Sequence, residues 1–124
     1  MKEQINKYLN QNKSLSFSEL LFSYIDKSGK SDSKIYNNVN IDRKLFSKIR
    51  CNENYLPKKI NVIKLCISLN LDLEDTKKLL KSAGYSLSTN NDFDLIISYF
   101  IENNIYNVDI INNYLFTYTS TTLI

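Results

Sequence analysis

Residues 31–50, SDSKIYNNVNIDRKLFSKIR, decide the fold that the chain is expected to adopt. Ser31 can cap a short helix that carries Ile35, because a serine hydroxyl accepts a hydrogen bond from an amide of the first turn. Asn40 suits a left-handed turn, since its short amide side chain tolerates positive φ. Asp42 can then cap a second helix. The stretch therefore predicts two short helices joined by a tight turn.

The second of these helices has two distinct faces. Leu45, Phe46 and Ile49 recur at helical spacing and predict the buried stripe. The remaining surface carries the polar and basic residues Arg43, Lys44, Ser47, Lys48 and Arg50. Seven bases and one acid lie between residues 43 and 64. This helix is therefore expected to pack by its apolar side and to present a basic face to solvent or to a polyanion.

Further helices are expected on both sides of this pair. Before it, Ser16 and Glu19 have the form of a capping box, and Gly29 ends the helix that they open. After it, Pro57 can open a helix, because the first turn needs no hydrogen bond from its nitrogen, and Asp72 can cap the next one. The apolar stripes of these three helices are Phe17, Leu20, Leu21, Tyr24 and Ile25, then Val62, Leu65, Cys66 and Leu69, then Leu73, Leu79 and Leu80.

The last third of the chain follows a stretch that indicates a linker, residues 86–91, which is rich in Ser, Thr and Asn. Asp92 is expected to cap a helix with a strongly apolar face, and Asn107 can cap a last short helix. Tyr99 and Tyr114 fall on apolar stripes of these two helices, where packing in a core or an interface is expected.

The composition favours helices throughout. Two glycines and one proline in 124 residues leave little of the turn chemistry that many short strands need. We therefore expect an all-α protein, with an N-terminal arm or short helix over residues 1–15. The tail, residues 117–124, favours extended structure but is expected to be unpaired.

Charge divides unevenly along the chain. Residues 1–81 hold all sixteen Lys and Arg residues and nine acids, a net charge of +7, whereas residues 82–124 hold four acids and no base. Such asymmetry suggests that the first two thirds face a polyanion and that the last third serves another purpose. An ordinary solvated surface with uneven charge is the alternative.

The composition argues against several kinds of site. With no histidine and only Cys51 and Cys66, the chain offers almost nothing to a zinc ion, and two reduced thiols are expected. No glycine-rich phosphate loop is possible with two isolated glycines, and the scattered carboxylates suit helix ends. We therefore expect no catalytic residue, no metal, no cofactor and no enzymatic activity.

Membrane association is not expected either. No apolar run approaches the roughly 18–20 residues of a membrane span, and the N-terminus has no signal-like apolar segment. The sequence predicts a cytoplasmic protein without a membrane partner.

Residues 17–80 resemble the lambda-repressor-like or Xre-type helix-turn-helix family, a fold of five helices in which the second and third read DNA. Ser31–Val39 match the second helix, Asn40–Asp42 match the turn where such proteins usually have Gly-Val-Ser, and Arg43–Arg50 match the third helix. Pro57 and the apolar stripe after it resemble the fourth helix. The order and spacing of these pieces carry the resemblance.

The resemblance implies that the third helix enters the major groove of DNA. Arg43 is the best candidate for a guanine contact, because its guanidinium fork matches O6 and N7. Lys44, Ser47 and Lys48 are expected near base edges or phosphates. The full set of residues implied to bind DNA is Arg43, Lys44, Ser47, Lys48, Arg50, Tyr55, Lys58 and Lys59. The last three would add backbone contacts from the loop and the fourth helix.

Three residues depart from the family pattern. Asp32 stands where a polar residue often grips phosphate, and its carboxylate would repel the DNA backbone. Tyr36 replaces the small residue that lets the two helices pack closely, and Asn40 replaces the glycine of the turn. These departures favour an alternative in which the scaffold binds a protein.

The resemblance implies that the chain binds double-stranded DNA through a helix-turn-helix domain over residues 16–85, as a transcriptional regulator of a bacterial or mobile-element operon. RNA is a further partner that the sequence does not separate from DNA. The alternative is a non-enzymatic interaction or inhibitor protein, for example one encoded by a phage, that binds a protein partner.

A homodimer is the last expectation. Residues 86–124 form a C-terminal helical extension with more apolar surface than two short helices are expected to hide, which makes it a candidate dimerisation element. The residues expected to pair the subunits are Phe93, Ile97, Phe100, Ile111 and Leu115.

Overall fold

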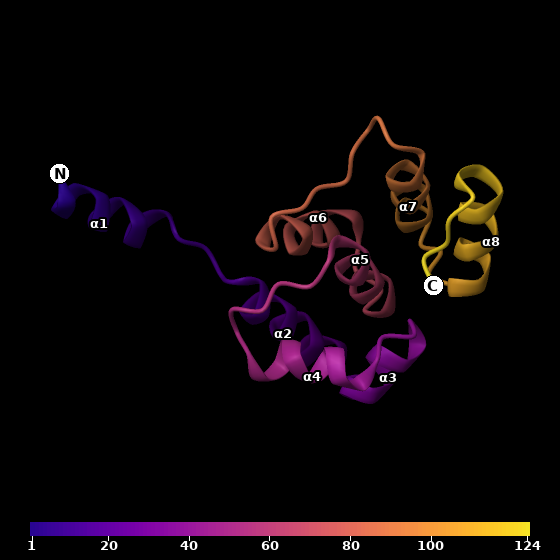
Figure 1. Cartoon of the computed structure of the whole chain (residues 1–124), viewed down its shortest axis with the longest axis horizontal. Helices are drawn as coiled ribbons and strands as arrows, with labels where there is room; N and C mark the ends of the chain where they lie inside the picture. The colour runs from indigo at the N-terminus through magenta and orange to yellow at the C-terminus, as the bar shows by residue number, and fades with distance from the viewer.

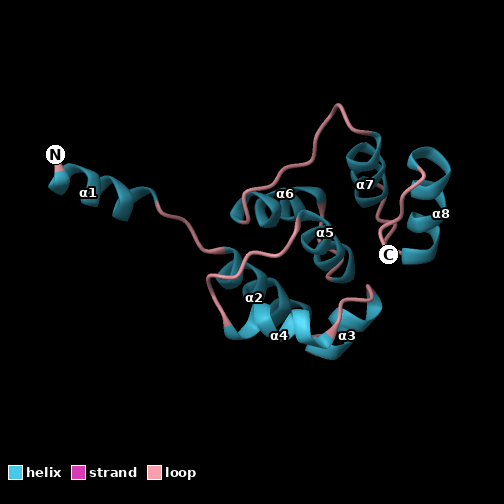
Figure 2. Cartoon of the chain, viewed as in Figure 1, coloured by secondary structure: helices cyan, strands magenta, loops and turns pink.

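The computed structural model describes residues 1–124 and is all-helical, with no strand (Figures 1 and 2). The prediction of an all-α protein is confirmed. The helices are α1 (Lys2–Asn12), α2 (Phe17–Ser28), α3 (Asp32–Asn38), α4 (Arg43–Cys51), α5 (Lys59–Ser68), α6 (Leu73–Ser82), α7 (Asp92–Glu102) and α8 (Val108–Thr119). No helix combines the length and the apolar content that a membrane span requires.

Local capping signals set most of the helix ends. The capping box at the start of α2 is confirmed, because the Ser16 hydroxyl accepts from the Glu19 amide at 3.1 Å and the Glu19 carboxylate accepts from the Ser16 amide at 3.3 Å. Gly29 ends α2 with a φ of 68°. Asp72 accepts from the Asp75 amide at 2.8 Å and so caps α6 as predicted. These ends follow from residues next to one another in the sequence.

Three predicted helix starts differ in the structure. Asp42 occupies the N-cap of α4, but its side chain makes no capping hydrogen bond. Pro57 lies before the N-cap of α5, because Lys58 has extended backbone with a ψ of 153° and the helix begins one residue later. Asp92 is the first residue of α7 rather than its cap, since the Asn91 side chain accepts from the Asp94 amide at 3.2 Å.

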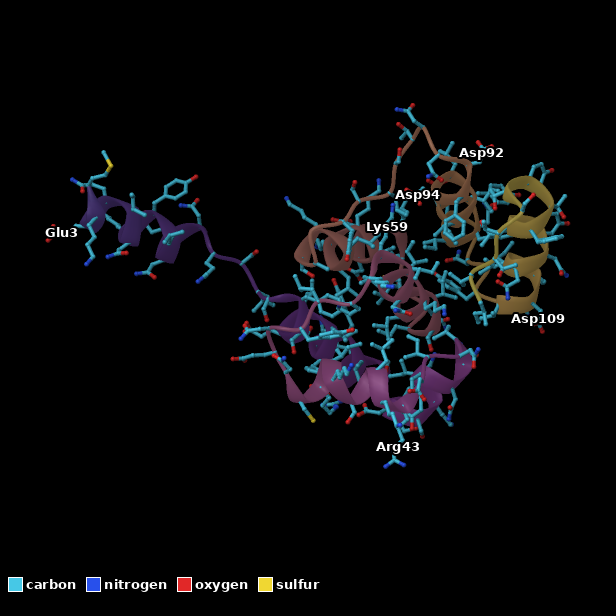
Figure 3. All side chains as sticks on the ribbon, viewed as in Figure 1. Glu3, Arg43, Lys59, Asp92, Asp94 and Asp109 are labelled. Atoms are coloured by element: carbon cyan, nitrogen blue, oxygen red, sulfur yellow. The ribbon has the colours of Figure 1, made fainter.

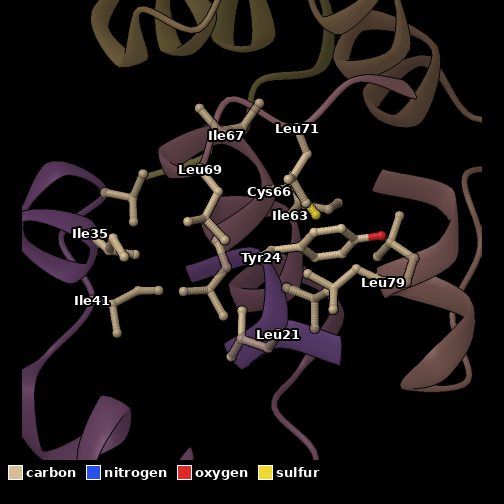
Figure 4. Close-up of a cluster of buried hydrophobic side chains, with 14 of the residues drawn as sticks. Leu21, Tyr24, Ile35, Ile41, Ile63, Cys66, Ile67, Leu69, Leu71 and Leu79 are labelled. Atoms are coloured by element: carbon tan, nitrogen blue, oxygen red, sulfur yellow. The ribbon is translucent and has the colours of Figure 1, made fainter. Parts of the chain in front are cut away.

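The core is organised around α5, which is buried on nearly every side. Its residues from Val62 to Ser68 are all buried except Lys64, and they pack against α3 and α6. Figure 4 shows side chains of α2, α3, α5 and α6 meeting in this cluster. Ser68 is the buried polar residue that ties α3 to α5, because its hydroxyl donates to the carbonyl of Ile35 at 2.6 Å. The hydrogen bond satisfies the buried hydroxyl and links α5 to α3.

The C-terminal helices belong to the same hydrophobic core. Ile97, Phe100, Ile111 and Leu115 are at most 4% exposed and lie in one buried cluster with the side chains of α5 and α6. The prediction that these four residues pair two subunits is therefore wrong, because the chain buries them itself. Phe93, the fifth residue of that prediction, is half-buried against the same core.

The tail also contributes to this packing. Leu123 is 2% exposed, and the amides of Leu123 and Ile124 both donate to the Asn112 side-chain oxygen, at 2.8 and 3.0 Å. The tail pairs with no strand, as predicted, but residues 117–119 are helical rather than extended. α8 runs through Thr119, and the last residues fold back over it, which helps to hide the apolar surface that two helices alone would leave open.

An ion pair fastens the linker before α7 to the core. The Lys59 ammonium of α5 lies 2.7 Å from a carboxylate oxygen of Asp94, whose side chain is 3% exposed. The amide of Ser88 donates to the same oxygen at 2.8 Å. Residues 86–91 are therefore tied at Ser88 to the first turn of α7.

The N-terminal arm stands apart from this body. None of the residues of α1 is buried, and residues 13–16 lead from it into α2 without helical structure. Figure 1 shows α1 extending away from the body, at the end opposite α7 and α8.

Candidate nucleic-acid interface

The turn between α3 and α4 is fixed by its backbone and by two buried side chains. Asn40 has a φ of 53°, as its position in the sequence predicted. The Ile41 amide donates to the carbonyl of Tyr36 at 2.8 Å, and both Val39 and Ile41 are buried. The turn therefore holds α4 at a defined angle to α3.

α4 packs by its apolar stripe and exposes the rest of its surface. Phe46 and Ile49 are 3% and 0% exposed, and Leu45 is half-buried. The rings of Tyr36 and Phe46 lie 5.3 Å apart between the two helices. The large Tyr36, where the resemblance leads one to expect a small residue, thus becomes part of the contact between α3 and α4.

Four of the predicted DNA-binding residues share the exposed face of α4. They are Arg43, Lys44, Ser47 and Lys48, at the spacing that places them side by side on a helix. The three cations among them make no ion pair, because the salt bridges of the chain are Arg50–Asp32, Lys59–Asp94 and Lys78–Glu74. Figure 3 shows Arg43 pointing outward from the body. The face is therefore free to meet a ligand of opposite charge.

Arg50 lies at the edge of this face and already contacts two side chains of the chain itself. Its guanidinium lies 2.8 Å from the carboxylate of Asp32 and 4.2 Å from the centre of the Phe22 ring. Asp32, which was expected to repel a phosphate, is thus paired with a cation. The same contact holds Arg50 away from the role of an independent phosphate ligand.

The three predicted residues outside α4 lie in different surroundings. Lys58 is exposed and makes no ion pair. Lys59 is directed toward α7 by its pairing with Asp94, and Figure 3 shows that pair well away from Arg43. Tyr55 is half-buried and packs against the hydrophobic core. The structure therefore brings together the four residues of α4 and does not bring Lys59 to them.

The buried titratable groups belong to the core. Cys66 is fully buried, and burial raises the pKa of its thiol to about 12. Burial and the neighbouring Asp75 carboxylate, which accepts from the tyrosine hydroxyl at 3.2 Å, raise the pKa of Tyr24 to about 12. Cys51 and Cys66 are both free thiols. No group of three or more acidic or cysteine side chains is arranged to hold a metal ion.

A second surface feature lies on the C-terminal helices, where the sequence predicted excess apolar surface but named other residues as its exposed members. A groove of about 660 Å³ runs between α7 and α8, and it is lined mainly by apolar side chains. Tyr99 and Tyr114, which were expected to be packed, line this groove and are 59% and 52% exposed. The available signal was that α7 has more apolar residues than one buried face needs.

Comparison with family models, with curated proteins and with solved structures finds no match to this chain.

Proposed function

We propose that the chain is a small DNA-binding protein of the helix-turn-helix type and that α4 is its recognition helix. The observation that carries the proposal is the exposed face of α4, where Arg43, Lys44 and Lys48 project without ion-pair partners. Duplex DNA carries about one negative charge per 1.7 Å of its axis. A compact group of unpaired cations on a rigid helix suits such a ligand.

The roles of the individual residues follow from their chemistry. Arg43 is the first residue of α4, and residues near the start of a recognition helix contact base edges. Its fork of donors suits the two acceptors of guanine in the major groove. Lys44 and Lys48 act as point charges that neutralise phosphates. Ser47 lies between them and supplies a hydroxyl to a base edge or a phosphate.

The ion pair between Arg50 and Asp32 affects the affinity for DNA in two ways. Pairing offsets the negative charge of Asp32 beside the approaching backbone. It also engages Arg50, so that this residue contributes less than an unpaired arginine would. Binding is therefore assigned first to the three free cations of α4, with Lys58 as an outer contact.

The biological role follows from the family resemblance of residues 17–80 and not from the geometry. Members of such a family regulate transcription, so the role proposed for this chain is the control of a bacterial or mobile-element operon in the cytoplasm. No catalytic step is assigned to it.

The test is charge reversal with a matched control. Lys44→Glu/Lys48→Glu changes the net charge by the same amount as Lys77→Glu/Lys81→Glu, which alters exposed, unpaired lysines on α6. Fluorescence anisotropy with a labelled duplex is expected to show a loss of binding of at least tenfold for the α4 variant and a much smaller loss for the α6 variant. Equal losses would mean that only net charge matters and would remove α4 from the proposal.

A second candidate, a scaffold that binds a protein, is favoured by the Arg50–Asp32 pair and by Tyr36. These residues give the surface next to α4 a mixed charge and an aromatic side chain, which protein interfaces use more than DNA contacts do. If the chain binds neither duplex DNA nor RNA at low salt, the protein-binding function is favoured. Competition between duplex DNA and RNA distinguishes the two nucleic acids.

A further inference from the structure

The groove between α7 and α8 is lined by eight apolar side chains and by Asp92. Leu95 and Tyr99 of α7 face Ile110, Tyr114 and Tyr118 of α8 across it, and Asp92 lies at its rim. These five apolar residues are at least 43% exposed. Exposed apolar surface of this kind, rimmed by polar residues, marks a binding site.

The groove belongs to the acidic last third of the chain, and Asp92 lines it. Residues 82–124 contain Asp92, Asp94, Glu102 and Asp109 and no Lys or Arg. Asp94 is neutralised by Lys59, and the other three carboxylates are exposed. The groove therefore suits an apolar segment that brings positive charge with it.

The arm at the other end of the chain has the complementary character. Ile5, Tyr8 and Leu9 of α1 lie on one face of the helix and are 51–66% exposed. Residues 1–13 carry three lysines and one glutamate, and Lys2 lies beside the apolar stripe. The arm is thus a basic amphipathic helix of a size that fits a groove between two helices.

The helical state of α1 also needs a partner. An isolated helix shorter than about 12–15 residues is marginal in water, and α1 has 11 residues, none of them buried. Its residues include three asparagines, which are weak helix formers. Burial of its apolar stripe against a partner would therefore stabilise the helix.

We propose that α1 of one copy docks in the α7–α8 groove of a second copy. α1 extends from the body at the end opposite α7 and α8 (Figure 1), so the arm of a second copy is the occupant that we assign to the groove. The nearer hollow, beside Leu15 and Leu20, is lined by Lys27, Lys78 and Asp75, so it lacks the acidic character of the last third of the chain. Reciprocal exchange of two arms closes a two-fold dimer.

Sedimentation equilibrium of the full chain without DNA tests this inference independently of the proposed function. The expected mass at high protein concentration is twice the 14.5 kDa of one chain. Ile5→Gln/Leu9→Gln is expected to restore the mass of one chain, and it cannot unfold the body, because α1 has no buried residue. Tyr99→Lys, which places a positive charge in the groove, is expected to do the same.

The control is Phe116→Gln, which removes a side chain that is 62% exposed on α8 and does not line the groove. It is expected to leave the association unchanged. A single-chain mass for the unmodified protein at every concentration would overturn the proposal. Association that survives the arm substitutions would also overturn it.

Zero-length cross-linking of mixed isotopic copies identifies which chain supplies the arm. Links from Lys2 or Lys7 to Asp92 or Asp109 are expected between a labelled and an unlabelled copy. If these links form only within one isotopic species, the arm folds onto its own body, and the second copy is excluded as the occupant.

Discussion

Loss of the Lys59 ammonium is expected to weaken the attachment of α7 to the core. Lys59→Met removes the cation that lies 2.7 Å from Asp94 and leaves a carboxylate that is 3% exposed. Removing one partner of a buried ion pair costs about 3–5 kcal/mol. The Lys59 side chain is one-third exposed, so water lowers the expected cost to about 2–3 kcal/mol.

Urea unfolding followed by circular dichroism measures this loss. With a denaturant slope of about 2 kcal/mol per molar urea, the midpoint is expected to fall by about 1–1.5 M. Lys58→Met is the matched control, because Lys58 is the neighbouring residue, is exposed and has no ion pair. Its effect is expected to stay within about 0.5 kcal/mol.

A double variant separates the ion pair from simple packing. Lys59→Met/Asp94→Leu removes both charges, and replacement of a buried pair by apolar residues is often close to neutral. We expect it to recover part of the stability that Lys59→Met loses. Equal unfolding midpoints for Lys59→Met and Lys58→Met would refute the reasoning, because they would show that Asp94 does not depend on its cation.

Three further predictions concern capping, thiol chemistry and the basic face. Ser16→Ala breaks the capping box of α2 and is expected to cost about 1 kcal/mol in urea unfolding; no change would mean that α2 is held by packing alone. Because burial raises the pKa of the Cys66 thiol to about 12, a thiol reagent at mildly alkaline pH should modify Cys51 alone in the native chain and both cysteines in urea. Rapid modification of two native thiols would contradict the burial of Cys66. Asp32→Asn frees Arg50 and should tighten DNA binding in anisotropy, whereas weaker binding would show that Asp32 positions Arg50 productively.

The fold could be predicted from the sequence wherever the signal was local. Ser16 and Asp72 accept hydrogen bonds from amides three residues later, and so they mark the starts of α2 and α6. Gly29 and Asn40 adopt positive φ just after α2 and α3. All four signals are local, so their positions alone indicated these helix ends. The apolar stripe of α4 was equally readable, because helical periodicity separates Phe46 and Ile49 from the basic residues. These features depend on the backbone geometry of one helix and little else.

The contacts that the sequence did not predict join distant residues. Asp32 meets Arg50 across 18 positions, and Lys59 meets Asp94 across 35. The sequence alone does not show that Arg50 and Lys59 have ion-pair partners, because those partners are distant along the chain. Only the packing of α3 on α4, and of α5 near α7, determines which cations of the candidate site are already paired.

The C-terminal third shows why apolar content alone does not identify an interface. α7 is apolar around most of its circumference, so periodicity does not decide which side faces the core. The structure buries Ile97 and Phe100 and leaves Tyr99 in an open groove. The docking of the tail was also not predictable from the sequence. It depends on hydrogen bonds from Leu123 and Ile124 to one side-chain oxygen, that of Asn112, which lies 11 and 12 positions earlier.

The most direct test of the account is the salt dependence of binding to a random DNA duplex, measured by fluorescence anisotropy. Among the residues predicted to bind DNA, Arg43, Lys44, Lys48 and Lys58 are the exposed cations without ion pairs. If each neutralises one phosphate, the logarithm of the affinity should fall against the logarithm of the salt concentration with a slope of about −3.6. A slope near that value supports α4 as a DNA-reading helix, and the absence of binding at low salt would contradict it.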